Sequence, residues 1–167
     1  MTINAAHWHV LLNHIPIIGL PMVALLLAWG VARAHDAVIR LALIATVLMG
    51  AATWVVVLTG TRAAEEVKEA KYTWVKRDVI EEHEEAGEKA EIAAIVTGVL
   101  ALTVLVIARG GKPPHRRATL GVLLGLGISA VLLGWTGWEG GRIRHDEFVA
   151  NPTAAQPPIP GETAPTP

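Results

Sequence analysis

Four long apolar runs alternate with polar segments along the chain. We place the runs at about residues 10–31, 37–59, 90–108 and 118–138. Each holds about 19–23 residues with few or no charges, enough for a helix to cross a hydrocarbon core of about 30 Å. The pattern predicts an all-α fold, an integral membrane four-helix bundle that occupies residues 1–150.

The polar segments differ in composition. Residues 61–89 contain two acidic clusters, at 65–69 and 81–85, and almost no turn-forming residues. We therefore expect an extra-membrane helical outer loop whose second half continues directly into the third span. The last segment, residues 151–167, is rich in Pro, Thr and Ala, which predicts a disordered Pro-rich tail.

Composition supports the membrane interpretation and narrows the chemistry. The 167 residues are 52% hydrophobic with a mean hydropathy of +0.44, too apolar for a soluble domain of this size. The net charge of −1 gives no support to a nucleic-acid partner. The chain has no cysteine, so any haem would be bound non-covalently, as haem b. No nucleophile–base pair or phosphate loop is apparent, so we do not expect an enzyme that acts on its own.

Basic residues indicate an orientation. The first connection between spans carries Arg33 and Arg40. The third connection contains no acid and four basic residues, namely Arg109, Lys112, Arg116 and Arg117. By the positive-inside rule both connections are cytoplasmic. The sequence therefore predicts a multi-pass protein of the bacterial inner membrane, embedded in the lipid bilayer with both termini in the periplasm.

Five of the seven histidines map to the predicted outer side. His7, His9 and His14 open the first span, His83 precedes the third, and His145 follows the fourth. Imidazole is a common ligand for haem iron and for transition metals. For haem b we favour His14 with His83, because we expect His14 to lie deepest in the bundle and His83 to come from the diagonal helix.

The depths of the histidines relative to the ends of their spans favour a second set of ligands. His14 lies about one turn inside its span, whereas His83 and His145 lie roughly 10 Å outside theirs at about 1.5 Å per residue. His9, His83 and His145 are therefore better matched in depth and suit a copper, zinc or iron ion. Glu66, or its neighbour Glu65, is the candidate carboxylate ligand, and His14 is a further imidazole candidate.

The helix that carries His83 continues with small residues. Ala86, Gly87, Ala90 and Ala94 follow it at helical spacing on one face. Small residues mark close helix contacts in membrane bundles, and they also leave room for a flat ligand. The sequence does not separate these two interpretations.

The end of the fourth span combines glycines with arginines. Four glycines fall within eight residues, at positions 134, 137, 140 and 141. Each costs a helix up to about 1 kcal/mol relative to Ala, so a close backbone contact, a helix break or a bound group must account for them. Arg142 and Arg144 follow, and they suit an anionic partner such as a lipid phosphate, a loop glutamate or a haem propionate.

Two of these stretches resemble a known family. His9-Val-Leu-Leu-Asn-His14-Ile-Pro16 is similar to its opening motif, and Gly137-Trp-Glu-Gly-Gly-Arg-Ile-Arg-His145 is similar to its closing motif. Over roughly residues 7–147 the chain resembles the bacterial membrane family known as domain of unknown function 2231, or a sister family of it. The resemblance implies a membrane bundle with outer-side histidines and no established activity.

Three functional hypotheses follow. The first is a membrane protein that binds haem b through histidines at the periplasmic end of the bundle. It would act in electron transfer or as a subunit of a redox complex, with periplasmic or membrane redox partners. The second is a periplasmic-face metal-binding protein that uses His and Glu. The third is a non-catalytic structural membrane subunit. The sequence leaves the oligomeric state open.

Overall fold

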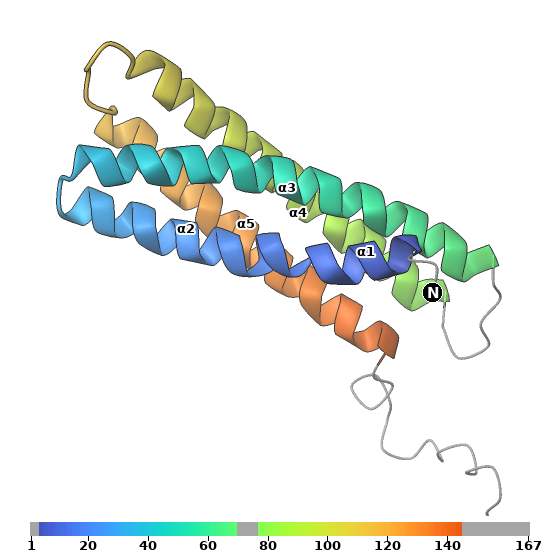
Figure 1. Cartoon of the computed structure of the whole chain (residues 1–167). Helices are drawn as coiled ribbons and strands as arrows, with labels where there is room; N and C mark the ends of the chain where they lie inside the picture. The colour runs from blue at the N-terminus through green and yellow to red at the C-terminus, as the bar shows by residue number, and fades with distance from the viewer. Residues whose placement is uncertain (1–3, 70–76, 145–167) are drawn as a thin grey trace, which may run out of the picture.

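The computed structural model describes residues 4–69 and 77–144, and its regular structure there is entirely helical. Its five helices are α1 (Ala5–Leu12), α2 (His14–Ala32), α3 (Asp36–Glu69), α4 (Arg77–Ile107) and α5 (Arg116–Arg144). α1 and α2 together form one of four segments that are long and apolar enough to cross a membrane. The predicted all-α four-helix bundle is therefore confirmed (Figure 1).

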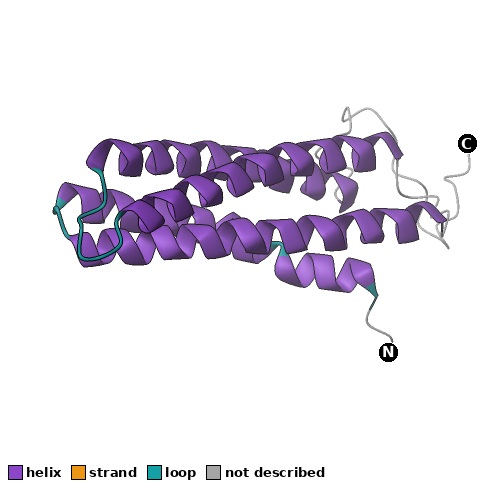
Figure 2. Ribbon diagram, turned by 90° about the horizontal axis from the view of Figure 1, so that it is seen from above, coloured by secondary structure: helices purple, strands orange, loops and turns teal. Residues whose placement is uncertain are grey.

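The four long helices run up and down and close into a ring. α3 packs against α2 and α4, and α5 packs against α4 and α2, so that α2 and α4 lie across a diagonal. The start of α1, the end of α3, the start of α4 and the end of α5 share one end of the bundle, which we call the histidine end (Figures 1 and 2). The connections 33–35 and 108–115 share the opposite end, which we call the cationic end.

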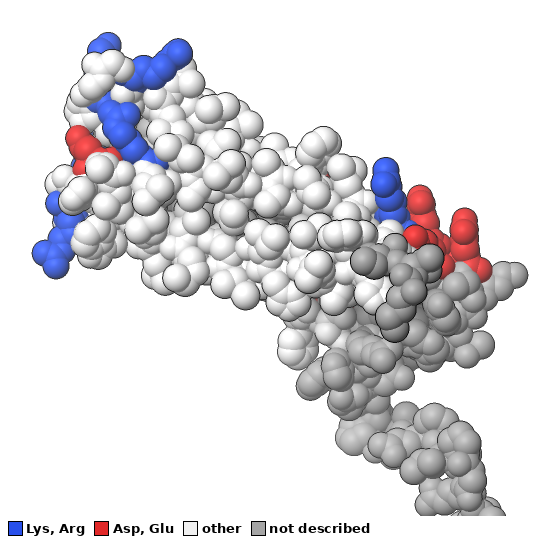
Figure 3. Space-filling view, in the orientation of Figure 1, with Lys and Arg blue, Asp and Glu red and all other residues white. Residues whose placement is uncertain are grey.

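The distribution of apolar side chains is that of a membrane protein. Large apolar side chains cover the outside of the bundle, and Leu25 and Val131 are 67% and 72% exposed. Charged side chains gather at the two ends and are missing from the visible face between them (Figure 3). An apolar exterior of this extent requires lipid around it. The chain is therefore a multi-pass membrane protein in contact with the bilayer.

The acidic loop is helical on both of its flanks. α3 extends ten residues beyond the predicted span to Glu69, and α4 begins at Arg77 and continues without a break into the third span. The expected helical outer loop is thus built from extensions of the transmembrane helices. Residues 70–76 and the expected tail at 151–167 lie outside the described residues.

Small residues bring α3, α4 and α5 close together. A Cβ atom on Gly50 of α3 would lie 3.0 Å from the carbonyl oxygen of Ala94 and 3.6 Å from the Cα of Gly98, both on α4. Ala90 and Ala94 are almost completely buried. The small-residue face after His83 therefore serves close helix contact at Ala94, and room for a flat ligand along the same face stays a prediction.

Hydroxyl groups in the core are satisfied within their own helices. Thr46, Thr53, Thr97 and Ser129 are buried, and each donates a hydrogen bond to the carbonyl oxygen four residues earlier. This local bond removes the cost of an unpaired polar group inside a membrane bundle. These side chains therefore belong to the core and supply no free polar group for a site.

The first span is broken at Asn13, three residues before Pro16. Pro16 has no N–H to donate to the carbonyl of Leu12, and its ring crowds that carbonyl. α1 accordingly ends at Leu12, and α2 begins at His14 with a different axis (Figure 2). α1 packs mainly on α3, whereas α2 packs on both α3 and α5. The break directs His9 toward α3 and leaves His14 exposed.

The close contact at Gly50 leads to a stability prediction. Gly50→Ala places a methyl group 3.0 Å from a backbone oxygen of α4, which should destabilise the bundle by about 1–3 kcal/mol. The matched control is Gly127→Ala on α5, where a Cβ atom meets nothing within 4 Å. Thermal unfolding in detergent should show a lower Tm for the first variant only. Equal Tm values would contradict the close contact.

Candidate functional site

Two histidines from different helices meet at the histidine end. His9 lies on α1 and His83 on α4, and both are half-buried. Their ring centroids are 6.1 Å apart, and the ring planes are inclined by 79°. The sequence separates these residues widely, and the packing of α1 and α4 against α3 is what brings them together.

Each of the two imidazoles is oriented by a backbone carbonyl of another helix. Nδ1 of His9 lies 3.1 Å from the oxygen of Val56 on α3, and Nδ1 of His83 lies 3.0 Å from the oxygen of Thr136 on α5. A carbonyl oxygen can only accept, so Nδ1 is the donor in both bonds. In the neutral ring the lone pair then resides on Nε2. Metal-binding histidines commonly show this arrangement.

A glycine makes room for each ring. Gly60 follows Val56 by four residues, and Gly140 follows Thr136 by four residues, so each glycine stands one turn beyond the accepting carbonyl. A Cβ atom on Gly60 would lie 2.9 Å from Cε1 of His9, and one on Gly140 would lie 3.0 Å from Cε1 of His83. His9 is therefore seated against α3, and His83 against α5, in the same way.

The glycine-rich end of the fourth span is thereby explained in part. α5 continues through this region to Arg144, so the glycines do not break the helix. Gly140 accommodates the ring of His83, and Gly137 faces the side chain of Ile17 on α2 at 3.9 Å. Gly134 and Gly141 have no neighbour within 4 Å of an added Cβ atom, and nothing in the structure explains them.

Ion pairs fix the start of α4 beside its neighbours. Arg142 of α5 contacts Glu82 at 2.6 Å and also pairs with Glu139, which is 6% exposed. Lys68 of α3 contacts Glu84 at 2.6 Å. Both glutamates that flank His83 are thus bound to cations from adjacent helices. Of the anionic partners expected for Arg142, the structure shows the glutamate of the loop.

The structure places the other predicted site residues apart from this pair. His14, which we expected to lie deepest in the bundle, is exposed, and its Nδ1 lies 3.2 Å from the oxygen of Val10. Glu66 is exposed and accepts from the backbone N–H of Ala5 at 3.3 Å. Any ligand role for these two residues stays a prediction.

Two further candidates fall outside what the structure describes. His145 lies beyond the described residues, and the side chain of Arg144 is not described. Their proposed contacts with haem or metal also stay predictions.

The set of ligands near the pair is small. Across residues 4–69 and 77–144 no group of three or more His, Asp or Glu side chains is placed to hold one metal ion. Zinc sites in proteins use three or four protein ligands. Two imidazoles alone suit a centre that brings its remaining ligands with it, or an ion that needs only two.

One polar atom near the pair is unsatisfied. Asn13 follows His9 by one helical turn, and its Oδ1 atom is buried with no hydrogen-bond partner in the described part of the chain. Buried polar atoms in proteins are usually paired with protein or with ordered water. Asn13 therefore leaves an open hydrogen-bonding position one turn from His9.

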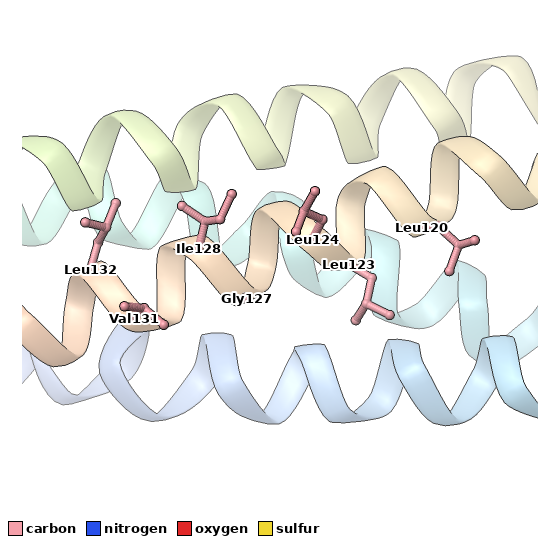
Figure 4. A pocket seen from close by; sticks show the side chains of 7 residues that line it. All are labelled: Leu120, Leu123, Leu124, Gly127, Ile128, Val131 and Leu132. Carbon is pink, nitrogen blue, oxygen red and sulfur yellow. The ribbon is translucent and has the colours of Figure 1, made fainter.

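Two hollows of the bundle surface lie away from the histidines. One groove follows the apolar outer face of α5 (Figure 4), lined by Leu120, Leu123, Leu124, Gly127, Ile128, Val131 and Leu132. A second lies between α3 and α4 beside Gly50 and Gly98. Both are apolar grooves on the outside of the bundle, as expected for surfaces that lipid chains cover.

Sequence reasoning missed the groups that seat the two rings. Val56 and Thr136 act through their carbonyl oxygens, which no side-chain pattern reveals. Gly60 and Gly140 did leave a signal, because each stands at the end of an apolar run where a helix continues. Comparisons of the chain with protein-family models, with curated proteins and with solved structures find no match. The resemblance to the family of domain of unknown function 2231 therefore stays a prediction.

The seat of His9 can be tested by a double-mutant cycle. Gly60→Ala should destabilise the protein by about 1–3 kcal/mol, because the new methyl group overlaps the ring of His9. In a His9→Ala background the ring is gone, and the same glycine substitution should cost much less. Thermal unfolding of the four proteins gives the coupling. Additive effects would show that the ring does not occupy this space.

Proposed function

We propose that the protein binds one haem b at the histidine end, with His9 and His83 as the two axial ligands, and that it transfers electrons. The observation that carries this proposal is the pair of imidazoles 6.1 Å apart. Two metal–nitrogen bonds of about 2.0–2.1 Å, together with the two ring radii, separate the ring centroids by about 6 Å. The observed separation is therefore compatible with one metal atom between the rings.

The number of ligands favours haem over a bare ion. Haem iron already has four porphyrin nitrogens, and histidines from two helices of a bundle complete its coordination. His9 and His83 come from different hairpins, and neither needs a third protein ligand in this role. This proposal replaces His14 with His9, because only His9 is brought to His83.

The surrounding residues would hold the ligands in place. Val56 and Thr136 accept the Nδ1 protons, which orients both rings and raises the basicity of Nε2. Gly60 and Gly140 allow the rings to approach the helix backbones. When bound, haem supplies one-electron chemistry, and the protein sets its potential through these ligands and the polarity around them.

We also propose where the protein sits. The basic connections favour a cytoplasmic location for the cationic end, which puts the histidine end on the periplasmic side of a bacterial inner membrane. A redox partner would then exchange electrons with the centre from the periplasm or from the membrane. The charged extensions of α3 and α4 offer the polar surface for a partner at that end.

A copper ion is the second candidate. Imidazole nitrogens suit copper, and cuprous copper accepts two ligands, so the same pair of rings could hold it without a third residue. The two candidates differ in optical absorption and in metal content.

Haem binding is tested by the optical spectrum of the purified protein. We expect a Soret band and sharp reduced α and β bands, with one haem per chain. His9→Ala and His83→Ala should each lose these bands or convert the centre to a high-spin form, because one axial ligand is missing. His14→Ala and His7→Ala are the matched controls on the same helical segment, and they should retain the spectrum.

Two kinds of result would contradict haem binding by His9 and His83. A colourless protein with stoichiometric copper, lost in the same two variants, would replace haem by copper. A colourless protein without metal, or a spectrum that depends on His14 and not on His9, would overturn the proposed pair.

The orientation is tested with fused reporters. A phosphatase that is active only in the periplasm should be active after Pro167 and inactive when inserted at Gly111 between α4 and α5. A fluorescent protein that matures only in the cytoplasm should give the reverse pattern. The opposite result at both positions would overturn the proposed orientation.

A further inference from the structure

Positive charge is concentrated at the cationic end. The segments 33–40 and 108–117 contain six Lys and Arg side chains and a single acid, Asp36. The cations are Arg33, Arg40, Arg109, Lys112, Arg116 and Arg117, and all except Arg40 are exposed. Figure 3 shows Lys and Arg side chains grouped at the cationic end of the bundle.

One of these cations ties the two connections together. Arg40 near the start of α3 donates from Nη2 to the carbonyl oxygen of Ala108 at 3.0 Å and to that of Lys112. Gly110 and Gly111 have φ values of 68° and 82°, a left-handed conformation that lets the connection turn back over the end of the bundle. The charges of the third connection are therefore held over the start of α3 and do not extend away from it.

Within residues 4–69 and 77–144, no cation of this end forms an ion pair with an acid. In the described residues every ion pair lies at the histidine end, where Lys68, Lys89 and Arg142 meet glutamates. At the cationic end Arg109 donates only to the neutral carbonyl of Val106. In the described part of the chain, ion pairs to glutamate therefore involve three cations of the histidine end and none of the cationic end.

The position of the cluster indicates what compensates it. It lies directly beyond the apolar exterior, at the depth where phospholipid headgroups meet a transmembrane bundle. Trp29, which is 50% exposed, lies beside His35 with ring centroids 6.2 Å apart, and tryptophan in such a position favours the headgroup region. Anionic headgroups carry the phosphate groups that Arg and Lys bind.

We propose that the cationic end is a binding site for anionic phospholipid, held by Arg109, Arg116 and Arg117 together with the connection that Arg40 fixes. The positive-inside rule, which sets the topology, requires only an excess of basic residues in the cytoplasmic connections. It does not require that the connections be tied together, or that ion pairs be confined to the other end. This inference is independent of the proposed haem.

The test is a lipid titration followed by native mass spectrometry. Delipidated protein in detergent is titrated with phosphatidylglycerol or with phosphatidylcholine of the same acyl chains. The triple variant Arg109→Gln, Arg116→Gln, Arg117→Gln is compared with Arg62→Gln, Arg77→Gln, Lys89→Gln at the histidine end. All three cations of the control are also exposed. Thermal unfolding checks that both variants are folded.

We expect the natural chain and the control to prefer phosphatidylglycerol. The first triple variant should lose at least about tenfold of that preference, given the attraction per cation at an anionic surface. Three results would overturn the proposal. They are equal binding of the two lipids by the natural chain, an equal loss in both variants, and displacement of the lipid by millimolar inorganic phosphate, which would indicate a site for soluble anions.

Discussion

Proline at position 16 withholds the N–H that the carbonyl of Leu12 would need, and the first membrane segment changes direction there as a consequence. A straight helix would run from Ala5 to Ala32 along a single axis. With the break, α1 packs on α3, while α2 packs against both α3 and α5. On this side of the break the ring of His9 lies against Gly60 of α3, and beyond it His14 is exposed. The candidate site thus depends on one missing backbone donor.

The second requirement of the site is close approach between helices. The α3–α4 contact at Gly50 and Gly98 and the burial of Ala90 and Ala94 keep the bundle narrow. At the histidine end the same closeness lets an imidazole of one helix bond a backbone carbonyl of the next. Each hairpin contributes one ring, one carbonyl and one glycine, so the two halves of the chain make equivalent contributions to the pair of rings.

Much of the architecture could be read from the sequence, because the apolar runs and the basic connections reflect the bilayer directly. The number of spans, their helical nature and the continuation of the acidic loop into the third span are confirmed. Pro16 interrupts the first apolar run, but proline is tolerated within many membrane helices, so the change of helix axis could not be predicted from it. Which histidines meet could not be predicted either. That outcome depends on a change of axis at Asn13 and on carbonyl partners that leave no trace in residue types.

The central claim is that His9 and His83 bind one haem iron between them, and electron paramagnetic resonance of the oxidised protein tests it most directly. In a haem held by both histidines, ring planes inclined by 79° would make the two iron orbitals that interact with the imidazoles nearly equal in energy. Such near-perpendicular axial imidazoles give a highly anisotropic low-spin ferric signal, whereas parallel ones give a rhombic signal. We therefore predict the highly anisotropic signal, with nitrogen couplings from two imidazoles in the pulsed experiment. A high-spin ferric signal, or coupling to a single imidazole, would contradict the claim.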